Sequence, residues 1–170
     1  RNKMKIIEIL RNRLSANNTL FVQNEHGIYQ EVSFEFYNPI TIEHINNFEL
    51  SNNIVLPDSY KEFLQISNGA ILFRDIKYDQ WGCKILSIEE LINKTNYIKK
   101  IGYNIKESWI VFAEWLGDGD TLLFDLERLK DYIIDGDSGY NTNKWEYLNG
   151  NFENFLDRLI VSQGSKYWRW

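Results

Sequence analysis

Residues 57–69 begin with a proline and end with a glycine, and together with the residues before them they give the clearest local signal of structure in the chain. Residues 54–56 precede Pro57, and a residue before proline is pushed out of the helical basin, so the chain enters in extended form. Pro57 suits a first helical turn, where its missing N–H is no loss, and Asp58 places negative charge at the positive end of the helix dipole. The stretch therefore predicts an extended segment followed by a helix start.

The same stretch shows one buried face and a defined end. Side chains suited to a buried stripe recur at three- and four-residue spacing, at Tyr60, Phe63, Leu64 and Ser67. Asn68-Gly69 ends the pattern, because glycine tolerates the left-handed conformation that closes many helices. We expect a short helix with one face in the core.

Hairpin signals dominate the rest of the chain. Helices are expected at 2–16, 42–48, 88–99 and 152–160, and strands at 20–22, 28–36, 70–73, 84–86, 109–113, 121–124, 132–134 and 145–147. Partial alternation in 28–36 predicts an edge strand, whereas the apolar run 109–113 predicts a central strand covered on both faces. Because no βαβ rhythm appears, we expect one α+β domain, residues 1–170, with a mainly antiparallel twisted sheet flanked by helices.

The net charge is −5, and the acidic residues gather in one segment of the chain. They are Glu107, Glu114, Asp118, Asp120, Asp125, Glu127, Asp131, Asp135 and Asp137, opposed there only by Arg128 and Lys130. Such a field repels nucleic acid and attracts basic partners. An ordinary solvated face explains the same charges equally well.

We expect a cytoplasmic protein. No apolar run approaches the roughly 20 residues that span a bilayer, and charges interrupt the first apolar residues, unlike a signal peptide. Cys83 stands alone, which suits a reducing compartment. We therefore expect no membrane association.

Few residues can carry chemistry. His26, His44 and Cys83 are too scattered for a zinc site or a catalytic triad, and no glycine-rich loop cradles a phosphate. Residues 135–146 follow a calcium-loop register, but Tyr140 stands where the bend needs glycine. We predict no cofactor, no metal and no catalytic residue.

Paired carboxylates leave one enzymatic alternative open. Glu114 with Asp118, or Asp120 with Asp125, lies near tryptophan in the sequence, as in a sugar-cleaving cleft. Acids beside a hairpin turn more often serve turn geometry. A glycoside hydrolase is therefore the more distant reading.

Aromatic residues make up 15% of the chain and supply the remaining signal. Trp81, Trp115 and Tyr140 lie in or beside predicted turns among acids, so we expect their rings to be exposed. Aromatic anchors within an acidic rim are typical of a protein-binding surface. The tail 167–170 is either docked or exposed, and the sequence leaves both readings open.

The proline-to-glycine stretch, Leu-Pro-Asp-x-Tyr-Lys-x-Phe-Leu-x-x-x-Asn-Gly, resembles the signature of the SUKH superfamily of Smi/Knr-like domains. Glu49 matches an acidic residue of that family, and weaker matches follow at 85–91, 112–120, Asp125 and the last helix. The resemblance covers roughly residues 40–160, with 1–37 as an extension. It assigns to the fold the residues Leu56, Pro57, Tyr60, Phe63, Leu64, Asn68 and Gly69.

The resemblance implies an α+β fold and, for bacterial members, an immunity protein that neutralises a cognate polymorphic toxin, often a nuclease or deaminase. We expect a monomer or weak homodimer that binds a toxin with a basic surface and no nucleic acid. The predicted contact residues are Trp81, Trp115, Asp118, Asp120, Asp135 and Asp137. A regulatory scaffold of the cell-wall-assembly type is the alternative.

Overall fold

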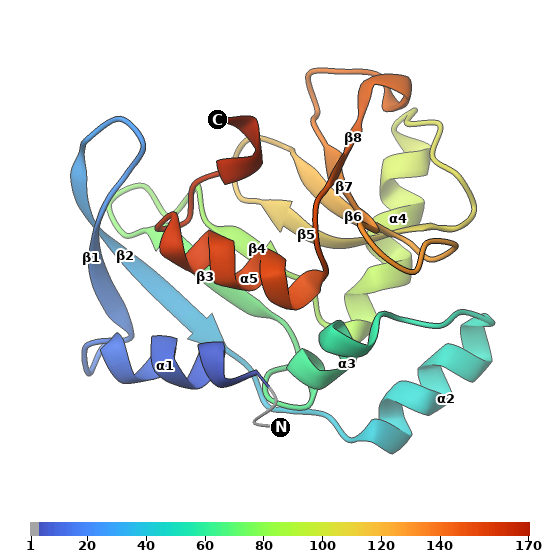
Figure 1. Ribbon diagram of the computed structural model, residues 1–170, viewed down its shortest axis with the longest axis horizontal. Coiled ribbons are helices and arrows are strands. Elements are labelled where there is room, and N and C mark those ends of the chain that lie inside the picture. Colours follow the sequence, from blue (N-terminus) through green and yellow to red (C-terminus); the bar gives the residue numbers. More distant parts are fainter. Residues whose placement is uncertain (1–3) are drawn as a thin grey trace.

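The strands of the computed structural model, which describes residues 4–170, form one antiparallel sheet whose strands follow chain order (Figure 1). They are β1 (Thr19–Gln23), β2 (Tyr29–Phe36), β3 (Ala70–Asp75), β4 (Cys83–Ile85), β5 (Trp109–Trp115), β6 (Thr121–Asp125), β7 (Ile133–Gly136) and β8 (Glu146–Leu148). The α-helices are α1 (Lys5–Arg13), α2 (Ile42–Asn52), α3 (Asp58–Leu64), α4 (Leu91–Lys100) and α5 (Phe152–Val161). Short 3-10 turns are η1 (Ile88–Glu90), η2 (Thr142–Lys144) and η3 (Tyr167–Arg169). The predicted α+β class is confirmed, and positions 2 and 3 of the expected first helix lie outside the described residues.

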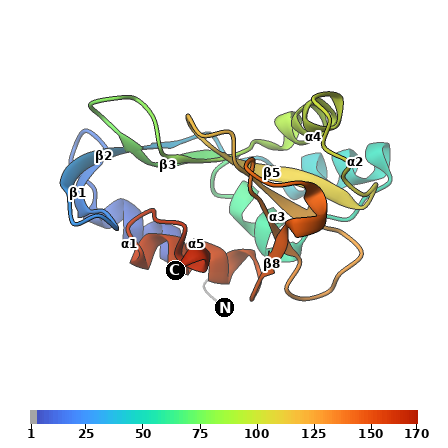
Figure 2. The ribbon, with the colours of Figure 1, turned by 90° about the horizontal axis from the view of Figure 1, so that it is seen from above.

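Helices cover the sheet on both faces, as Figure 2 shows. Helices α1, α3 and α5 lie along one face, and α4 packs against β5 on the other. Helix α5 turns a stripe of five buried residues toward the sheet: Phe152, Phe155, Leu156, Leu159 and Ile160. Within residues 4–170, no helix is long and apolar enough to cross a membrane.

Tyr60 of α3 lies at the centre of the core. Its ring is fully buried and packs edge-on against Phe124 and Phe152, with centroids 5.2 and 5.3 Å away. Its hydroxyl donates a hydrogen bond to the Leu86 carbonyl at 2.9 Å, so the buried polar group is satisfied. Phe112 and Phe124 stack with centroids 3.9 Å apart, which joins β5 and β6 beneath this helix.

The two ends of the α3 stretch explain its remaining signature residues. Glu49 accepts a hydrogen bond from the Leu56 N–H at 2.6 Å and pairs with Lys61 at 3.4 Å, so it fixes the extended entry. Asn68 accepts from the Ile88 N–H at 2.9 Å. Gly69 has φ +88°, and a Cβ there would lie 2.9 Å from the Ile85 carbonyl oxygen. Only glycine fits both constraints.

The structure corrects one strand assignment and supports another. Strand β2 is not at the edge, because β1 pairs along its outer side from Thr19↔Ser33 to Gln23↔Tyr29. Its partial alternation arises because one face of β2 is only half covered, as its mixed burial shows. The predicted central strand is confirmed, since β5 lies between β4 and β6 and six of its seven residues are buried.

Candidate functional site

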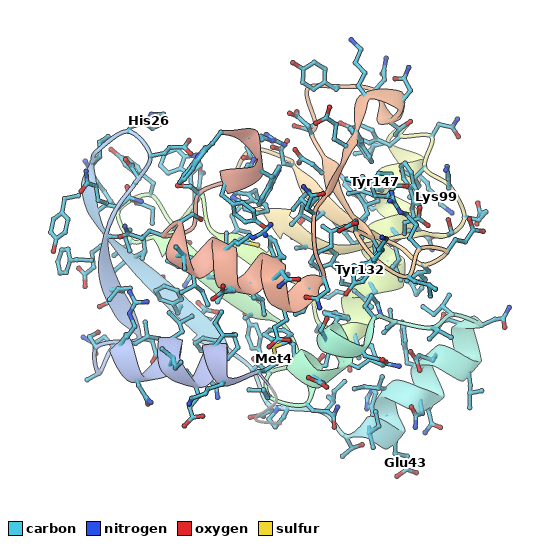
Figure 3. All side chains as sticks on the ribbon, viewed as in Figure 1. Met4, His26, Glu43, Lys99, Tyr132 and Tyr147 are labelled. Carbon is cyan, nitrogen blue, oxygen red and sulfur yellow. The ribbon has the colours of Figure 1, made fainter. Side chains whose placement is uncertain are left out.

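A broad groove lies between three segments that are far apart in the sequence. Its walls are the β1–β2 hairpin tip at 24–31, the β3–β4 loop at 75–81, and the C-terminal segment 163–170. The groove has a volume of about 1510 Å³. Figure 1 shows the C-terminus ending between this hairpin and β5–β7, and Figure 3 shows His26 at the hairpin tip. We take this groove as the candidate binding site.

Aromatic rings with exposed faces line this groove. Trp81 is 51% exposed and its ring packs edge-on against Tyr78, with centroids 5.2 Å apart. Lys77 places its ammonium 4.9 Å from the Tyr78 ring centroid. Tyr29 and Trp170, on the other two walls, are still more exposed. Large amphipathic rings exposed together are a feature of protein-binding surfaces.

The β3–β4 loop holds Trp81 in an uncommon backbone conformation. Trp81 has φ +63° and Asp79 has φ +56°, both in the left-handed region that bulky residues rarely adopt. A hydrogen bond from the Trp81 N–H to the Leu116 carbonyl at 2.7 Å fixes the turn. Such strain persists only where the surroundings enforce it, and it is concentrated at binding sites. The loop therefore fixes the backbone of Trp81, and the indole packs against Tyr78.

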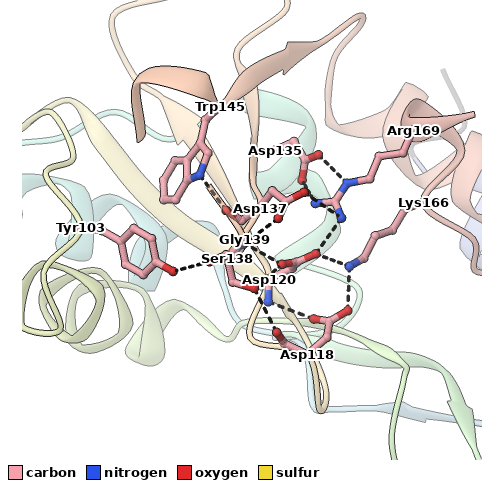
Figure 4. A network of polar contacts seen from close by, with 10 residues as sticks. All are labelled: Tyr103, Asp118, Asp120, Asp135, Asp137, Ser138, Gly139, Trp145, Lys166 and Arg169. Atoms are coloured by element: carbon pink, nitrogen blue, oxygen red, sulfur yellow. Dashed lines mark hydrogen bonds and ion pairs between the residues drawn. The ribbon is translucent and has the colours of Figure 1, made fainter. Parts of the chain in front are cut away.

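The C-terminal segment is held by an aspartate cluster, defined as Asp118, Asp120, Asp135 and Asp137 (Figure 4). Lys166 contacts Asp118 at 2.7 Å and also Asp120. Arg169 binds both oxygens of Asp135 in a fork, each at 2.7 Å, and reaches Asp120 at 2.9 Å and Asp137 at 3.3 Å. A bidentate guanidinium–carboxylate pair is among the stronger polar contacts in proteins.

The ion pairs change the pKa values of the groups that form them. Burial by itself would raise the pKa of Asp120, but hydrogen bonds from Lys166 and Ser138 outweigh it and lower that pKa to about 2. Burial would lower the pKa of Arg169, but its bonds to Asp135 and the charges of Asp120 and Asp137 raise it. Both groups are thus charged at neutral pH, and the cluster is largely occupied by this chain's own cations.

Asp120 makes stability depend on acid pH. Its pKa in the folded protein, about 2, lies below its ordinary value of 3.8, so its stabilising contribution is complete above about pH 4 and is lost as pH falls toward 2. We expect urea unfolding to show a smaller loss of stability between pH 4 and 2 in Asp120→Asn than in the unaltered protein. Equal losses in the two proteins would contradict this assignment.

The structure separates the six predicted contact residues into two groups. Trp81, Trp115 and Asp118 line the groove, whereas Asp120, Asp135 and Asp137 face Lys166 and Arg169 in the network of Figure 4. The predicted exposure of Trp81 and of Tyr140 is confirmed.

The predicted exposure of the Trp115 ring is wrong. Trp115 is 6% exposed, because β5 continues through it and the C-terminal segment covers it. Trp168 packs edge-on against its ring at 5.4 Å, and the Lys166 ammonium lies 5.0 Å from the ring centroid. Trp115 therefore contributes to the floor of the groove as a supported, mostly covered ring.

Sequence reasoning missed Tyr29, Tyr78 and Trp170 as groove residues. Tyr78 and Trp81 lie in one short polar loop, where two large rings so close together were a usable signal. Tyr29 and Trp170 gave no such signal, because they reach the groove only when the hairpin tip and the C-terminus meet in space.

The carboxylate pairs considered for glycoside hydrolysis are not brought together. Glu114 pairs with Lys94 of α4, whereas Asp118 pairs with Lys166 of the C-terminal segment. Asp120 directly precedes β6 and Asp125 is its last residue, and five residue steps along a strand span about 16 Å, beyond the roughly 5–10 Å that the reaction needs. Within residues 4–170, no group of three or more histidine, cysteine or acidic residues is placed to hold a metal.

Comparison with known proteins gives the family. Two proteins of Bacillus subtilis (strain 168) are similar to this chain. The uncharacterized protein YobM is 28% identical over 142 residues, which cover 76% of this chain and 70% of that protein. The uncharacterized protein YnaB is 26% identical over 146 residues, which cover 82% and 89%. Their names state no activity.

A family model matches residues 39–158, close to the 40–160 expected from the resemblance, and that span includes the α3 stretch and most of α5. Of the three groove walls, only the β3–β4 loop lies inside the matched span. Because the match covers most of the sequence, the chain belongs to the SMI1/KNR4 family (SUKH-1).

Proposed function

We propose that this protein is an immunity protein that binds a cognate toxin protein through the groove and neutralises it by covering its active site. The observation that carries the proposal is the half-exposed Trp81 indole, which a strained, hydrogen-bonded loop fixes beside Tyr78. A fixed aromatic pair loses little conformational entropy on binding. It is therefore suited to be a hot spot, which supplies much of the binding free energy of a protein interface.

The charge of the groove supports a partner with basic side chains. Within residues 4–170, the groove carboxylate Glu31 forms no salt bridge with a lysine or arginine. Asp118 is paired with Lys166, and Asp75 is buried and accepts a hydrogen bond from the Tyr78 N–H. An unpaired carboxylate beside exposed rings favours a guanidinium or ammonium from the partner. Nuclease and deaminase toxins carry such groups where they bind nucleic acid, and the net charge of −5 disfavours nucleic acid itself as the ligand here.

The position of the groove supports a partner specific to this protein. The hairpin tip and the C-terminal segment flank the span that the family model matches, and they supply two of the three walls. Where part of a contact surface is built from segments that flank a shared domain, those segments can change to fit another partner. The core of the domain then stays intact. In this proposal the protein acts as a monomer or weak homodimer in the cytoplasm, without cofactor, on a toxin made in the same cell.

A coexpression and binding experiment tests the function. The proposal predicts that a large secreted protein is encoded beside this gene, and the C-terminal domain of that protein is the toxin to test. We expect this protein to restore growth of cells that express the domain, and a catalytically inactivated domain to form a 1:1 complex with it in light scattering and calorimetry. Absence of both protection and association would overturn the proposal.

Two outcomes would favour the alternatives instead. Capture of a cell-wall-assembly component, without protection from the toxin domain, would support the regulatory scaffold. Turnover of a glycoside that is abolished in Glu114→Gln at unchanged stability would support the hydrolase. Separation of the carboxylate pairs in the structure speaks against the second outcome.

A further inference from the structure

The last eight residues, 163–170, form a segment that we call the strap. It leaves α5 through Gly164, whose N–H bonds to the Leu159 carbonyl at 2.8 Å with φ +89°. A Cβ at Gly164 would lie 2.6 Å from the Phe73 Cβ, so the turn packs directly on a residue that lines the groove. Glycine at this position lets the strap turn back over the sheet.

The strap connects the two opposite sides of the groove. Toward the hairpin, the Gln23 N–H donates to the Gln163 side-chain oxygen at 3.0 Å, and the Trp170 indole N–H lies 3.4 Å from a Glu25 oxygen. Toward β5–β7, the aspartate cluster binds Lys166 and Arg169 (Figure 4). These contacts tie the strap to the β1–β2 hairpin, which lies outside the span matched by the family model, and to β5–β7, which lie inside it.

We propose that Lys166 and Arg169 are positioning residues for the groove: their ion pairs with the aspartate cluster dock the strap as its third wall, and the partner binds only the docked form. The inference rests on the proposed function for the partner, but docking of the strap can be measured without one. Neither cation needs to touch the partner, since each acts through the strap that it holds.

The physical basis is the charge balance of the cluster. Four aspartates from the ends of paired strands β6 and β7 and the β5–β6 turn face two cations, and Asp120 and Asp135 are almost fully buried. Removal of Arg169 leaves Asp135 without its cation and increases repulsion within the cluster. The strap then loses its strongest anchor, although Trp168 still packs on Trp115 and Phe155.

Hydrogen–deuterium exchange of peptides covering 162–170 tests docking directly. In Arg169→Ala we expect amide exchange there to be at least about tenfold faster, because a bidentate charged pair is lost. Lys166→Ala should accelerate it less, and Arg169→Lys should restore part of the protection. Arg128→Ala is the matched control, since Arg128 lies over the Tyr147 ring and outside the cluster. Unchanged exchange in Arg169→Ala would overturn the inference.

Binding of the inactivated toxin domain tests the consequence. We expect Arg169→Ala to lower affinity at least about tenfold, with the Arg128→Ala control binding like the unaltered protein. If the unaltered protein itself does not bind, the proposed function fails and the exchange result still decides strap docking. If it binds and Arg169→Ala binds equally or more tightly, the strap is not a required wall and the inference fails alone.

Discussion

Replacement of Tyr60 by alanine is expected to lower the free energy of unfolding by about 3–5 kcal/mol, the range for removing a large buried aromatic ring. The ring is fully buried against Phe124 and Phe152, so its loss leaves a cavity in the middle of the core. Urea unfolding followed by circular dichroism measures the change. A loss of this size takes up much of the stability of a domain of ordinary size.

Two further variants separate the ring from its hydroxyl and from general effects of substitution. Tyr60→Phe should lose only about 1 kcal/mol, because it removes one hydrogen bond, to the Leu86 carbonyl, and keeps the packing. Leu50→Ala is the control on an exposed residue of α2 and should change stability by less than about 0.5 kcal/mol. A loss below about 1 kcal/mol in Tyr60→Ala would contradict a central position for this ring.

Replacement of Trp81 by alanine is expected to weaken toxin binding at least about 30-fold, which corresponds to about 2 kcal/mol. The indole is half exposed in the free protein and stands beside Tyr78, so a partner that covers the groove buries it. Calorimetry with the inactivated toxin domain measures the affinity. Thermal unfolding should shift little, since an exposed ring contributes little to the folded state.

Tyr140→Ala provides the matched control for Trp81→Ala. Tyr140 is exposed to a similar extent, 55%, but it lies before β8 in a separate small hollow with Tyr103 and Lys144. We expect its substitution to leave affinity within about twofold of the unaltered protein. Equal losses in the two variants would place the contact surface elsewhere, and no loss in either would remove the groove from the interface.

Elements whose signals are local could be predicted from the amino-acid sequence alone. Helix α3 was predicted from the proline before it, the buried stripe through Tyr60 and the glycine that follows it. In the structure these residues lie in the core and in the turns at the ends of the helix. Asp118-Gly119 between apolar runs predicted the β5–β6 hairpin. These predictions succeeded because backbone preferences and hydrophobic periodicity act within a few residues of each other.

The candidate site, in contrast, depends on contacts that form only when the chain is folded. The groove exists because the hairpin tip, the β3–β4 loop and the strap meet, although they are separated by about 45 to 140 positions in the sequence. The aspartates that suggested an open acidic surface are paired with Lys166 and Arg169, and Trp115 is covered by Trp168. The composition gives the charged and aromatic residues of a chain, but it does not say which residues will lie against them. Burial and ion pairing depend on the residues that lie opposite in the folded protein, and therefore on long-range packing.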